Sequence, residues 1–129
     1  MVVDSSAIVA ILLGEPEQET FFHSIATAAD PATSVASVLE SSIVMHRRAG
    51  ASGLARVDRL VCASGLRCIP VDLPQALLAR RAWVRYGKGN SPAGLNFGDC
   101  FSYALASTLD RPLLFKGGDF TRTDVRVAA

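Results

Sequence analysis

Short apolar segments recur along the chain, and most of them lead directly into a stretch with helical spacing. The apolar segments lie at residues 2–4, 33–36, 66–71 and 111–115. A strand that leads into a helix is the repeating unit of a parallel sheet covered by helices. The sequence therefore predicts an α/β fold, with a mostly parallel central sheet of about four to five strands flanked by helices.

Capping residues and glycines set the expected ends of the helices. Gly14 ends the first helix, and residues 50–53, with a glycine at each end, are expected to break the helix that contains Glu40. Pro70 lacks a backbone N–H group, which predicts that its strand lies at an edge of the sheet. The expected helix N-caps are Ser5 or Ser6, Ser37, Asp72 and Asn96.

Length and charge limit the classes of protein to which the chain can belong. With 129 residues, of which 50% are hydrophobic, it is expected to form one domain over residues 1–129 with a substantial core. Its formal net charge of +1 gives no global attraction to nucleic acid or to an anionic membrane, so any polyanion must be held by a local patch. The longest apolar run, residues 7–13, is too short to span a membrane.

Three cysteines lie in apolar settings, without a CxxC motif or a histidine at zinc-ligand spacing. We therefore expect Cys62, Cys68 and Cys100 to be reduced core residues of a cytoplasmic protein. The N-terminus has neither the basic region nor the small-residue cleavage site of a signal peptide, which agrees with that location.

Several common catalytic motifs do not occur in the sequence. The serines lack a G-x-S-x-G setting, and there is neither a G-x-x-x-x-G-K-[ST] loop nor a G-x-G-x-x-G loop. His23 and His46 have no second histidine, cysteine or acid at zinc-ligand spacing. A hydrolase triad, a nucleotide-binding loop and a zinc site are therefore not supported.

Four acidic residues stand where an apolar segment ends or where a helix begins or buries a face. Asp4 closes the first apolar segment, Asp119 follows a Gly-Gly turn after the last one, Asp99 enters a helix, and Glu40 lies inside another. The functional crevice of a parallel sheet lies outside the carboxyl ends of its strands. Because ionised carboxylates are costly to bury without positive charge, the pattern predicts a hard divalent cation held by Asp4, Glu40, Asp99 and Asp119.

Glu40 is unusual because it shares a helix face with apolar residues, Ile43 and Val44. An acid on an apolar face is expected to serve a site. The structural alternative is an ion pair with Arg47 or Arg48.

The other three acids also have structural alternatives. Asp4 can be a helix N-cap, Asp99 a helix-start acid, and Asp119 part of a solvated turn. Asp124, five residues after Asp119 in the sequence, is a minor candidate for an outer-shell group in the same cleft.

A basic stripe on one predicted helix is the candidate surface for a polyanion. Arg81, Arg85 and Lys88 lie along this stripe, just before a loop rich in Gly, Asn, Ser and Pro. Taken alone, the stripe is better explained as a solvated helix face.

Taken together, several blocks resemble the PIN-domain toxins of the VapC type, from type II toxin-antitoxin systems. The blocks are residues 4–7 (Asp-Ser-Ser-Ala), Glu40 in its helix, 85–89 (Arg-Tyr-Gly-Lys-Gly), 95–100 (Leu-Asn-Phe-Gly-Asp-Cys) and 114–120 (Leu-Phe-Lys-Gly-Gly-Asp-Phe). The resemblance covers essentially the whole chain. It implies a PIN-like three-layer sandwich and a ribonuclease that hydrolyses RNA phosphodiester bonds with Mg²⁺, for which Mn²⁺ can substitute.

The resemblance also assigns roles to individual residues. Asp4, Glu40, Asp99 and Asp119 become the catalytic, metal-binding quartet, and Ser6 adds a hydroxyl beside the metal. RNA would be held by Arg81, Arg85 and Lys88, helped by Lys116 and Arg122. The implied partners are the RNA substrate, a second copy of the chain in a homodimer, and a VapB-type antitoxin, and no membrane is involved.

Two rival interpretations remain open at this point. One is a catalytically inactive PIN-like module that binds RNA or protein, although the presence of all four acids argues against it. The other is a phosphoryl-transfer domain with a nucleophilic aspartate. Such domains carry a D-x-D-x-T pattern at the first strand, whereas Asp4 is followed by Ser-Ser-Ala.

Overall fold

Four short strands form one sheet in which every neighbouring pair is parallel. The computed structural model describes residues 1–128. The strands are β1 (Val2–Val3), β2 (Ala32–Ser34), β3 (Arg67–Ile69) and β4 (Leu113–Leu114), in the spatial order β3-β2-β1-β4. The predicted parallel α/β sheet is confirmed, and β3 lies at an edge, as Pro70 indicated.

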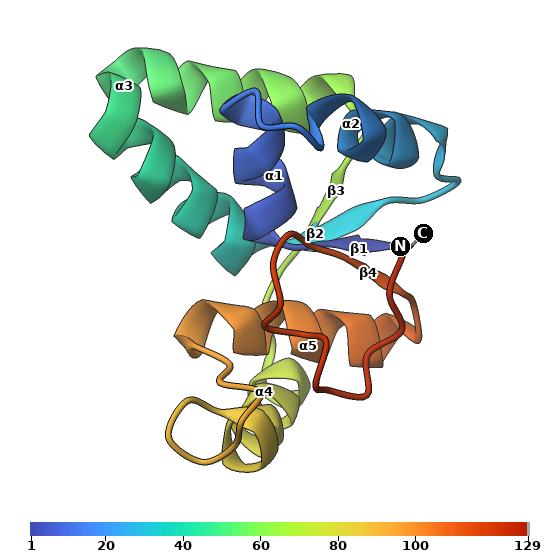
Figure 1. Ribbon diagram of the computed structural model, residues 1–129. Helices are drawn as coiled ribbons and strands as arrows, with labels where there is room; N and C mark the ends of the chain where they lie inside the picture. The colour runs from blue at the N-terminus through green and yellow to red at the C-terminus, as the bar shows by residue number, and fades with distance from the viewer. Residues whose placement is uncertain (129) are drawn as a thin grey trace.

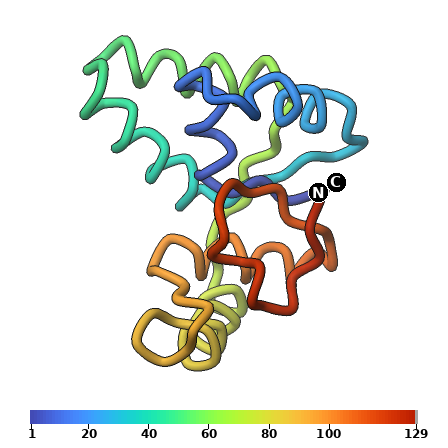
Figure 2. Tube along the Cα trace, in the orientation of Figure 1, coloured from blue at the N-terminus to red at the C-terminus, as the bar shows by residue number. Residues whose placement is uncertain are grey.

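Helices cover both faces of the sheet and give the molecule three layers (Figure 1). The helices α1 (Ser5–Leu12), α2 (Gln18–Thr27) and α3 (Val35–Ala63) lie on one face, and α4 (Leu73–Tyr86) and α5 (Phe97–Leu109) lie on the other. The backbone trace of Figure 2 shows the same separation, with the C-terminal segment running beside α5. The predicted three-layer sandwich is therefore confirmed.

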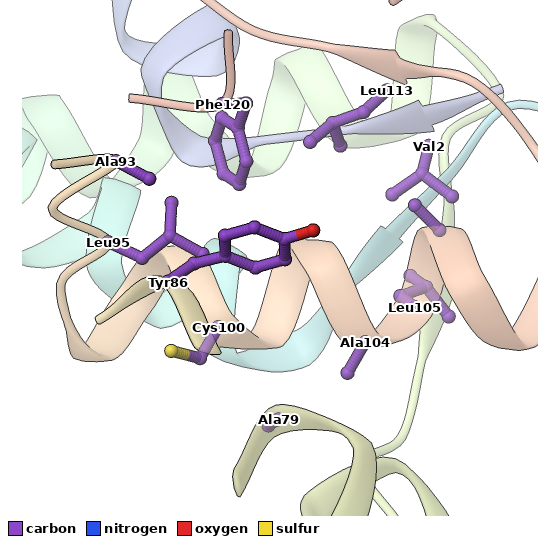
Figure 3. Packing of buried hydrophobic residues seen from close by; sticks show 11 residues of the cluster. Val2, Ala79, Tyr86, Ala93, Leu95, Cys100, Ala104, Leu105, Leu113 and Phe120 are labelled. Atoms are coloured by element: carbon purple, nitrogen blue, oxygen red, sulfur yellow. The ribbon is translucent and has the colours of Figure 1, made fainter. Parts of the chain in front are cut away.

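The core has two parts because side chains alternate across the strands. Val2 and Leu113 pack with α5 residues such as Leu105, in the cluster drawn in Figure 3. Their neighbours Val3 and Leu114 pack in the cluster that includes residues of α1 and α3 on the opposite face. In each of β1 and β4, two consecutive apolar residues therefore supply one side chain to each part of the core.

Two of the expected helix caps are wrong, and both real caps lie earlier in the chain. Asp4, not Ser5 or Ser6, caps α1, and Ser34, not Ser37, caps α3. The helices begin directly after the strands, so the residue at the junction must satisfy the first free N–H groups. The other two expected caps, Asp72 and Asn96, are confirmed.

The break expected at residues 50–53 is a sharp kink within α3. Gly50 adopts φ 57° and ψ −140°, after which the helix resumes. A Cβ atom at Gly53 would lie 2.2 Å from the carbonyl oxygen of Met45, so the two halves of α3 pack closely at this point. Glycine is needed at Gly50 for its positive φ and at Gly53 for close approach.

The cysteine expectation is only partly confirmed. All three thiols are free, and Cys100 is buried, but Cys62 and Cys68 are exposed and do not belong to the core. The apolar neighbours of these two residues in the sequence point inward while the cysteines face outward. Within residues 1–128, no helix combines the length and the apolar character needed to cross a membrane.

Candidate functional site: an acidic cluster at the carboxyl edge of the sheet

The four predicted acids come from elements that end or begin at the carboxyl edge of the sheet. Asp4 follows β1, Asp119 lies in the loop after β4, Glu40 lies in α3 after β2, and Asp99 lies in the first turn of α5. The Asp4 and Asp99 residues are only 2% and 7% exposed. Glu40 is half-buried and Asp119 is exposed. Two of the acids are therefore buried, and two lie nearer to solvent.

Asp4 is buried among hydroxyl and amide donors. Its Oδ2 accepts hydrogen bonds from the backbone N–H of Ser6 at 3.0 Å and from the Ser6 hydroxyl at 2.6 Å. Its Oδ1 accepts a hydrogen bond from the Ser102 hydroxyl at 2.5 Å. The alternative role of Asp4 as a helix cap is thus also real, and the cap places its carboxylate in the cluster.

Asp99 forms a reciprocal capping box with Asn96. The Asn96 N–H donates to Asp99 Oδ2 at 3.0 Å, and the Asp99 N–H donates to Asn96 Oδ1 at 2.8 Å. Burial raises the pKa of the Asp99 carboxyl to about 7, the bond from Asn96 opposes the rise, and the charges of Asp4, Asp119 and Glu40 add to it. The three other acids therefore act on Asp99 across the same space.

Glu40 lies against the first turn of α5. The Ser5 hydroxyl donates to Glu40 Oε1. A Cβ atom at Gly98 would lie 2.2 Å from Glu40 Oε2, so the carboxylate occupies the space that any larger residue would fill there. Gly98 therefore makes room for Glu40 beside Asp99.

The surroundings of Glu40 in the structure differ from those that the sequence predicted. The buried face of α3 near Glu40 carries Ser37 and Ser41, whereas Ile43 is 45% exposed. None of the ion pairs within residues 1–128 joins Glu40 to Arg47 or Arg48. Glu40 is thus held by a serine, in a polar setting that its apolar sequence neighbours did not indicate.

Asp119 lies in an exposed loop whose two ends are anchored by aromatic rings. Gly117 has φ 96° at the turn, and the buried Phe120 packs on Phe115 with ring centroids 5.0 Å apart. The anchored rings fix the loop beside β4 and leave Asp119 at the surface. Its charge contributes to the raised pKa of Asp99, so Asp119 lies near enough to act on the cluster.

The donor set of the cluster fits a hard divalent cation. None of the ion pairs formed within the described residues includes Asp4, Glu40, Asp99 or Asp119, so their charge is not compensated by an arginine or lysine. Carboxylate and hydroxyl oxygens are the ligands that Mg²⁺ and Mn²⁺ prefer. In residues 1–128 no three acidic, histidine or cysteine groups lie close enough together to enclose an ion as positioned. Mutual repulsion spreads uncompensated carboxylates, so a cation would have to draw them inward.

The predicted accessory residues have different surroundings. The Ser6 hydroxyl lies inside the cluster, where it donates to Asp4 and accepts from the Lys116 N–H at 3.0 Å. Asp124 accepts from the Tyr103 hydroxyl at 2.6 Å and lies 3.5 Å from Arg85. Ser6 thus contacts an acid of the quartet, whereas Asp124 is held by α4 and α5.

The predicted RNA-binding residues also differ in how they are engaged. Arg81, Arg85 and Lys88 are exposed, as a binding stripe requires. The Lys116 ammonium instead pairs with Glu15 and with Glu17, the latter at 3.1 Å. Those glutamates hold the loop that carries Asp119.

Two features near the cluster were not assigned to the site from the sequence. The serines Ser5, Ser37 and Ser102 contact the acids or one another, and the only available signal was the spacing of Ser102, three residues after Asp99. The second feature is an apolar groove of about 580 Å³ lined by residues of α4 and α5, including Trp83 and Phe97. Phe97 is 78% exposed at its rim.

The fold and the site together define a class: α/β proteins with an acidic cluster at the carboxyl edge of a parallel sheet. The sequence model of the PIN domain matches residues 1–126 of the chain. The chain therefore belongs to the PIN-domain family.

Curated relatives match over nearly the whole chain. A protein named Ribonuclease VapC from Mycolicibacterium smegmatis is 47% identical over 125 residues, which cover 97% of each chain. Ribonuclease VapC30 from Mycobacterium tuberculosis is 43% identical over 129 residues, which cover 100% of this chain and 98% of that protein. Both matches agree with the family that the sequence blocks indicated.

Solved structures show the same fold at low sequence identity. The crystal structure of Mycobacterium tuberculosis VapC20, described as a Sarcin-Ricin loop cleaving toxin, aligns with a TM-score of 0.79 and 18% identity over 98% of this chain and 97% of that one. A toxin-antitoxin complex from Klebsiella pneumoniae aligns with a TM-score of 0.74 and 16% identity, over 98% and 95% of the two chains. These likenesses concern the fold alone.

Proposed function

We propose that the protein is a metal-dependent ribonuclease that hydrolyses RNA phosphodiester bonds and acts as the toxin of a toxin-antitoxin pair. The observation that carries this proposal is the set of four carboxylates at one edge of the sheet without a compensating side-chain cation. Membership of the PIN-domain family and the ribonuclease names of the full-length relatives support it.

The proposed cofactor is Mg²⁺, with Mn²⁺ as a substitute, held by Asp4, Glu40, Asp99 and Asp119. When bound, such an ion lowers the pKa of a coordinated water and neutralises charge on the phosphate oxygens. The chain supports this role through its acids, which supply oxygen ligands, and through the burial of Asp4 and Asp99, which strengthens their attraction for a cation.

The acids would also take part in hydrolysis directly, in addition to binding the metal. Either Asp4 or Asp99 would orient the attacking water or accept its proton. The pKa of Asp99, raised by burial to about 7 in the metal-free chain, supports a proton-accepting role at this place. Ser6 holds Asp4 in position from the first turn of α1. We retain Asp124 as an outer group that acts through Tyr103 and Arg85.

RNA would lie along the exposed basic stripe formed by α4 and by Lys88 just after it. Arg81, Arg85 and Lys88 are exposed and can neutralise backbone phosphates. Lys116 can add to this surface only by leaving Glu15 and Glu17, with which it pairs. We therefore assign the larger share of phosphate binding to α4.

The proposed partners are a VapB-type antitoxin and a second copy of the chain. The groove between α4 and α5 supports a protein partner, because its wall is apolar and exposes Phe97, while Arg80 and Lys88 flank it. Large exposed apolar side chains also occur on α3, where Leu39 is exposed. We propose that residues 1–129 act as one domain, in the cytoplasm, where the exposed thiols would stay reduced.

Cleavage of RNA by the purified chain tests the proposal. We expect cleavage with Mg²⁺ or Mn²⁺ and none with a chelator, giving 5′-phosphate and 3′-hydroxyl ends. Asp99→Asn should abolish cleavage while circular dichroism shows an unchanged fold, since asparagine can keep the oxygen that accepts from Asn96.

A matched control comes from the opposite end of the same helix. Asp110 is exposed at the end of α5 and adopts φ 49°, a conformation that asparagine tolerates well. Asp110→Asn should therefore cleave RNA at the wild-type rate. Undiminished cleavage by Asp99→Asn would contradict the proposal, and a wild-type chain that binds RNA without binding Mn²⁺ or cleaving would favour an inactive binding module.

A further inference from the structure

A chain of buried hydroxyl groups leads to the carboxylate of Asp4. Ser102 is fully buried, and its hydroxyl donates to Asp4 Oδ1 at 2.5 Å. Ser37 is also buried, and its Oγ lies 3.2 Å from Ser102 Oγ. Buried polar groups are retained where they have partners, and here the partners form a single line toward one acid.

The direction of these hydrogen bonds follows from the chemistry of the groups. An ionised carboxylate only accepts, so the one hydrogen of the Ser102 hydroxyl must point to Asp4. Ser102 then has only lone pairs left for Ser37, which must donate to it. The chain therefore runs Ser37 to Ser102 to Asp4, and each bond strengthens the next because all three groups are buried.

This hydroxyl chain connects the elements that carry three of the four acids. Ser102 lies one helical turn after Asp99 in α5, on the same face. Ser37 lies one turn before Glu40 in α3, also on the same face. The hydroxyl chain ends at Asp4, which directly follows β1. Two hydrogen bonds thus fix the relative position of β1, α3 and α5 at the point where their acids meet.

The hydrogen bonds also decide which oxygen of Asp4 is open to a ligand. Within residues 1–128, Oδ2 already accepts from the Ser6 N–H and the Ser6 hydroxyl, whereas Oδ1 accepts only from Ser102. Since each carboxylate oxygen has two lone pairs, the remaining lone pair lies on Oδ1. The orientation set by Ser102 therefore determines where that lone pair points.

We infer that Ser102, supported by Ser37, is a positioning residue that aims Asp4 Oδ1 at the divalent cation. The inference rests on the proposed metal-dependent function, and it adds two residues for which neither the sequence blocks nor the relatives' names indicate a role. Groups that orient a metal ligand in this way typically change metal affinity by about 10- to 100-fold when removed.

Mn²⁺ affinity of the RNA-free protein tests this role, measured from the electron paramagnetic resonance signal of free Mn²⁺. We expect Ser102→Ala to bind Mn²⁺ about tenfold more weakly than the wild type, and Ser37→Ala to show a smaller loss in the same direction. Ser102→Thr keeps the hydroxyl and should restore most of the affinity.

Ser41→Ala is the matched control. Ser41 is as buried as Ser102, but its hydroxyl donates to the backbone carbonyl of Ser37 at 2.8 Å and, within the described residues, forms no hydrogen bond with an acid. A purely structural role predicts that Ser41→Ala and Ser102→Ala lower the melting temperature of the metal-free protein alike and leave Mn²⁺ affinity unchanged. A positioning role predicts that only Ser102→Ala and Ser37→Ala weaken Mn²⁺ binding.

The outcomes separate this inference from the function on which it rests. Wild-type affinity in Ser102→Ala, or an equal loss in Ser41→Ala, would overturn the positioning role while leaving the metal site intact. A wild-type protein that binds no Mn²⁺ would overturn both. If Ser102→Ala does not fold, Ser37→Ala and Ser102→Thr decide the question, and wild-type affinity in Ser37→Ala then counts against the inference.

Discussion

The two edges of the parallel sheet differ in whether their buried or half-buried acids are paired with cationic side chains. At the amino edge, Asp30 precedes β2 and accepts from the Arg67 Nε and Nη2 atoms at 3.1 and 2.9 Å and from Arg111 Nη1 at 2.8 Å. Hydrogen bonds from these two guanidinium groups lower the pKa of the Asp30 carboxyl to about 2. One acid here pairs with two cations and ties together the segment before β2, the first residue of β3 and the segment before β4.

At the carboxyl edge, none of the four acids pairs with an arginine or lysine of residues 1–128. Their partners within the described chain include the serine hydroxyls of Ser5, Ser6 and Ser102, and burial raises the pKa of Asp99 to about 7. The same chain thus neutralises an acid where it serves the fold and leaves the acids uncompensated where chemistry is proposed. The contrast explains why the amino edge is complete by itself and the carboxyl edge would gain from a cation.

The largest difference between the two edges should appear on replacing Asp4. Asp4→Asn removes a proposed metal ligand, and the loss of several kcal/mol of transition-state stabilisation corresponds to about a 10³-fold slower cleavage. An amide nitrogen cannot accept the hydrogen bonds that both Asp4 oxygens receive, so unfolding should also become easier by about 1–3 kcal/mol. Single-turnover RNA cleavage and urea denaturation measure the two effects. Cleavage at the wild-type rate would show that Asp4 serves the fold alone.

The pH dependence of stability should differ in sign at the two edges. The folded-state pKa of Asp99 lies above its ordinary value, so the metal-free native state holds a proton that the unfolded state has lost between about pH 4 and 7. The contribution of Asp99 to the free energy of unfolding is therefore fully present below about pH 4. It falls by at most about 4 kcal/mol as the pH rises to 7. Asp30 behaves oppositely: its lowered pKa adds stability above about pH 4, which is lost toward pH 2.

Urea denaturation of the chelator-treated protein across this pH range measures the Asp99 effect. Asp99→Asn should remove most of the fall between pH 4 and 7, and saturating Mn²⁺ should reverse it in the wild type. An identical pH profile for the wild type and Asp99→Asn would show that the Asp99 carboxyl titrates normally.

A third expected effect concerns the space that Gly98 leaves for Glu40. Gly98→Ala places a methyl group 2.2 Å from Glu40 Oε2, and the flexible end of that side chain must move away. We expect cleavage to slow by about 10- to 100-fold. Alanine favours a helix over glycine by up to about 1 kcal/mol, so the melting temperature should stay the same or rise. Unchanged cleavage in this variant would remove Glu40 from the site.

The smallest effect on activity is expected at the amino edge. Asp30→Asn weakens the contacts with Arg67 and Arg111, which are partly exposed, so the melting temperature should fall slightly. RNA cleavage per folded molecule should be unchanged, because Asp30 lies at the end of the sheet remote from the acids. A large loss of cleavage at full folding would mean that the two edges are not independent.

Local patterns in the sequence were enough to predict the parallel sheet and the edge at which the acids lie. The apolar pairs 2–3 and 113–114 each occupy a strand, and parallel strands bring their carboxyl ends together. The caps were harder to predict, because Asp4 and Ser34 serve at junctions where a strand passes into a helix without a linker.

Contacts between distant segments could not be derived from sequence patterns. Ser102 and Asp4 are 98 residues apart, and Lys116 and Glu15 are 101 residues apart. Such pairs form only once the sheet order and the helix packing are set, and neither is encoded in the local pattern. The Lys116 pairs also add a role, since a residue predicted to contact RNA also holds the Asp119 loop.

The most direct test of the contrast between the two edges is a calorimetric titration of the metal-free protein with Mn²⁺ at pH 8. We expect binding to the wild type, equal affinity in Asp30→Asn, and strongly reduced affinity in Asp4→Asn and Asp99→Asn. Absence of Mn²⁺ binding to the wild type, or equal affinity in all four proteins, would contradict the claim that the carboxyl edge is a cation site.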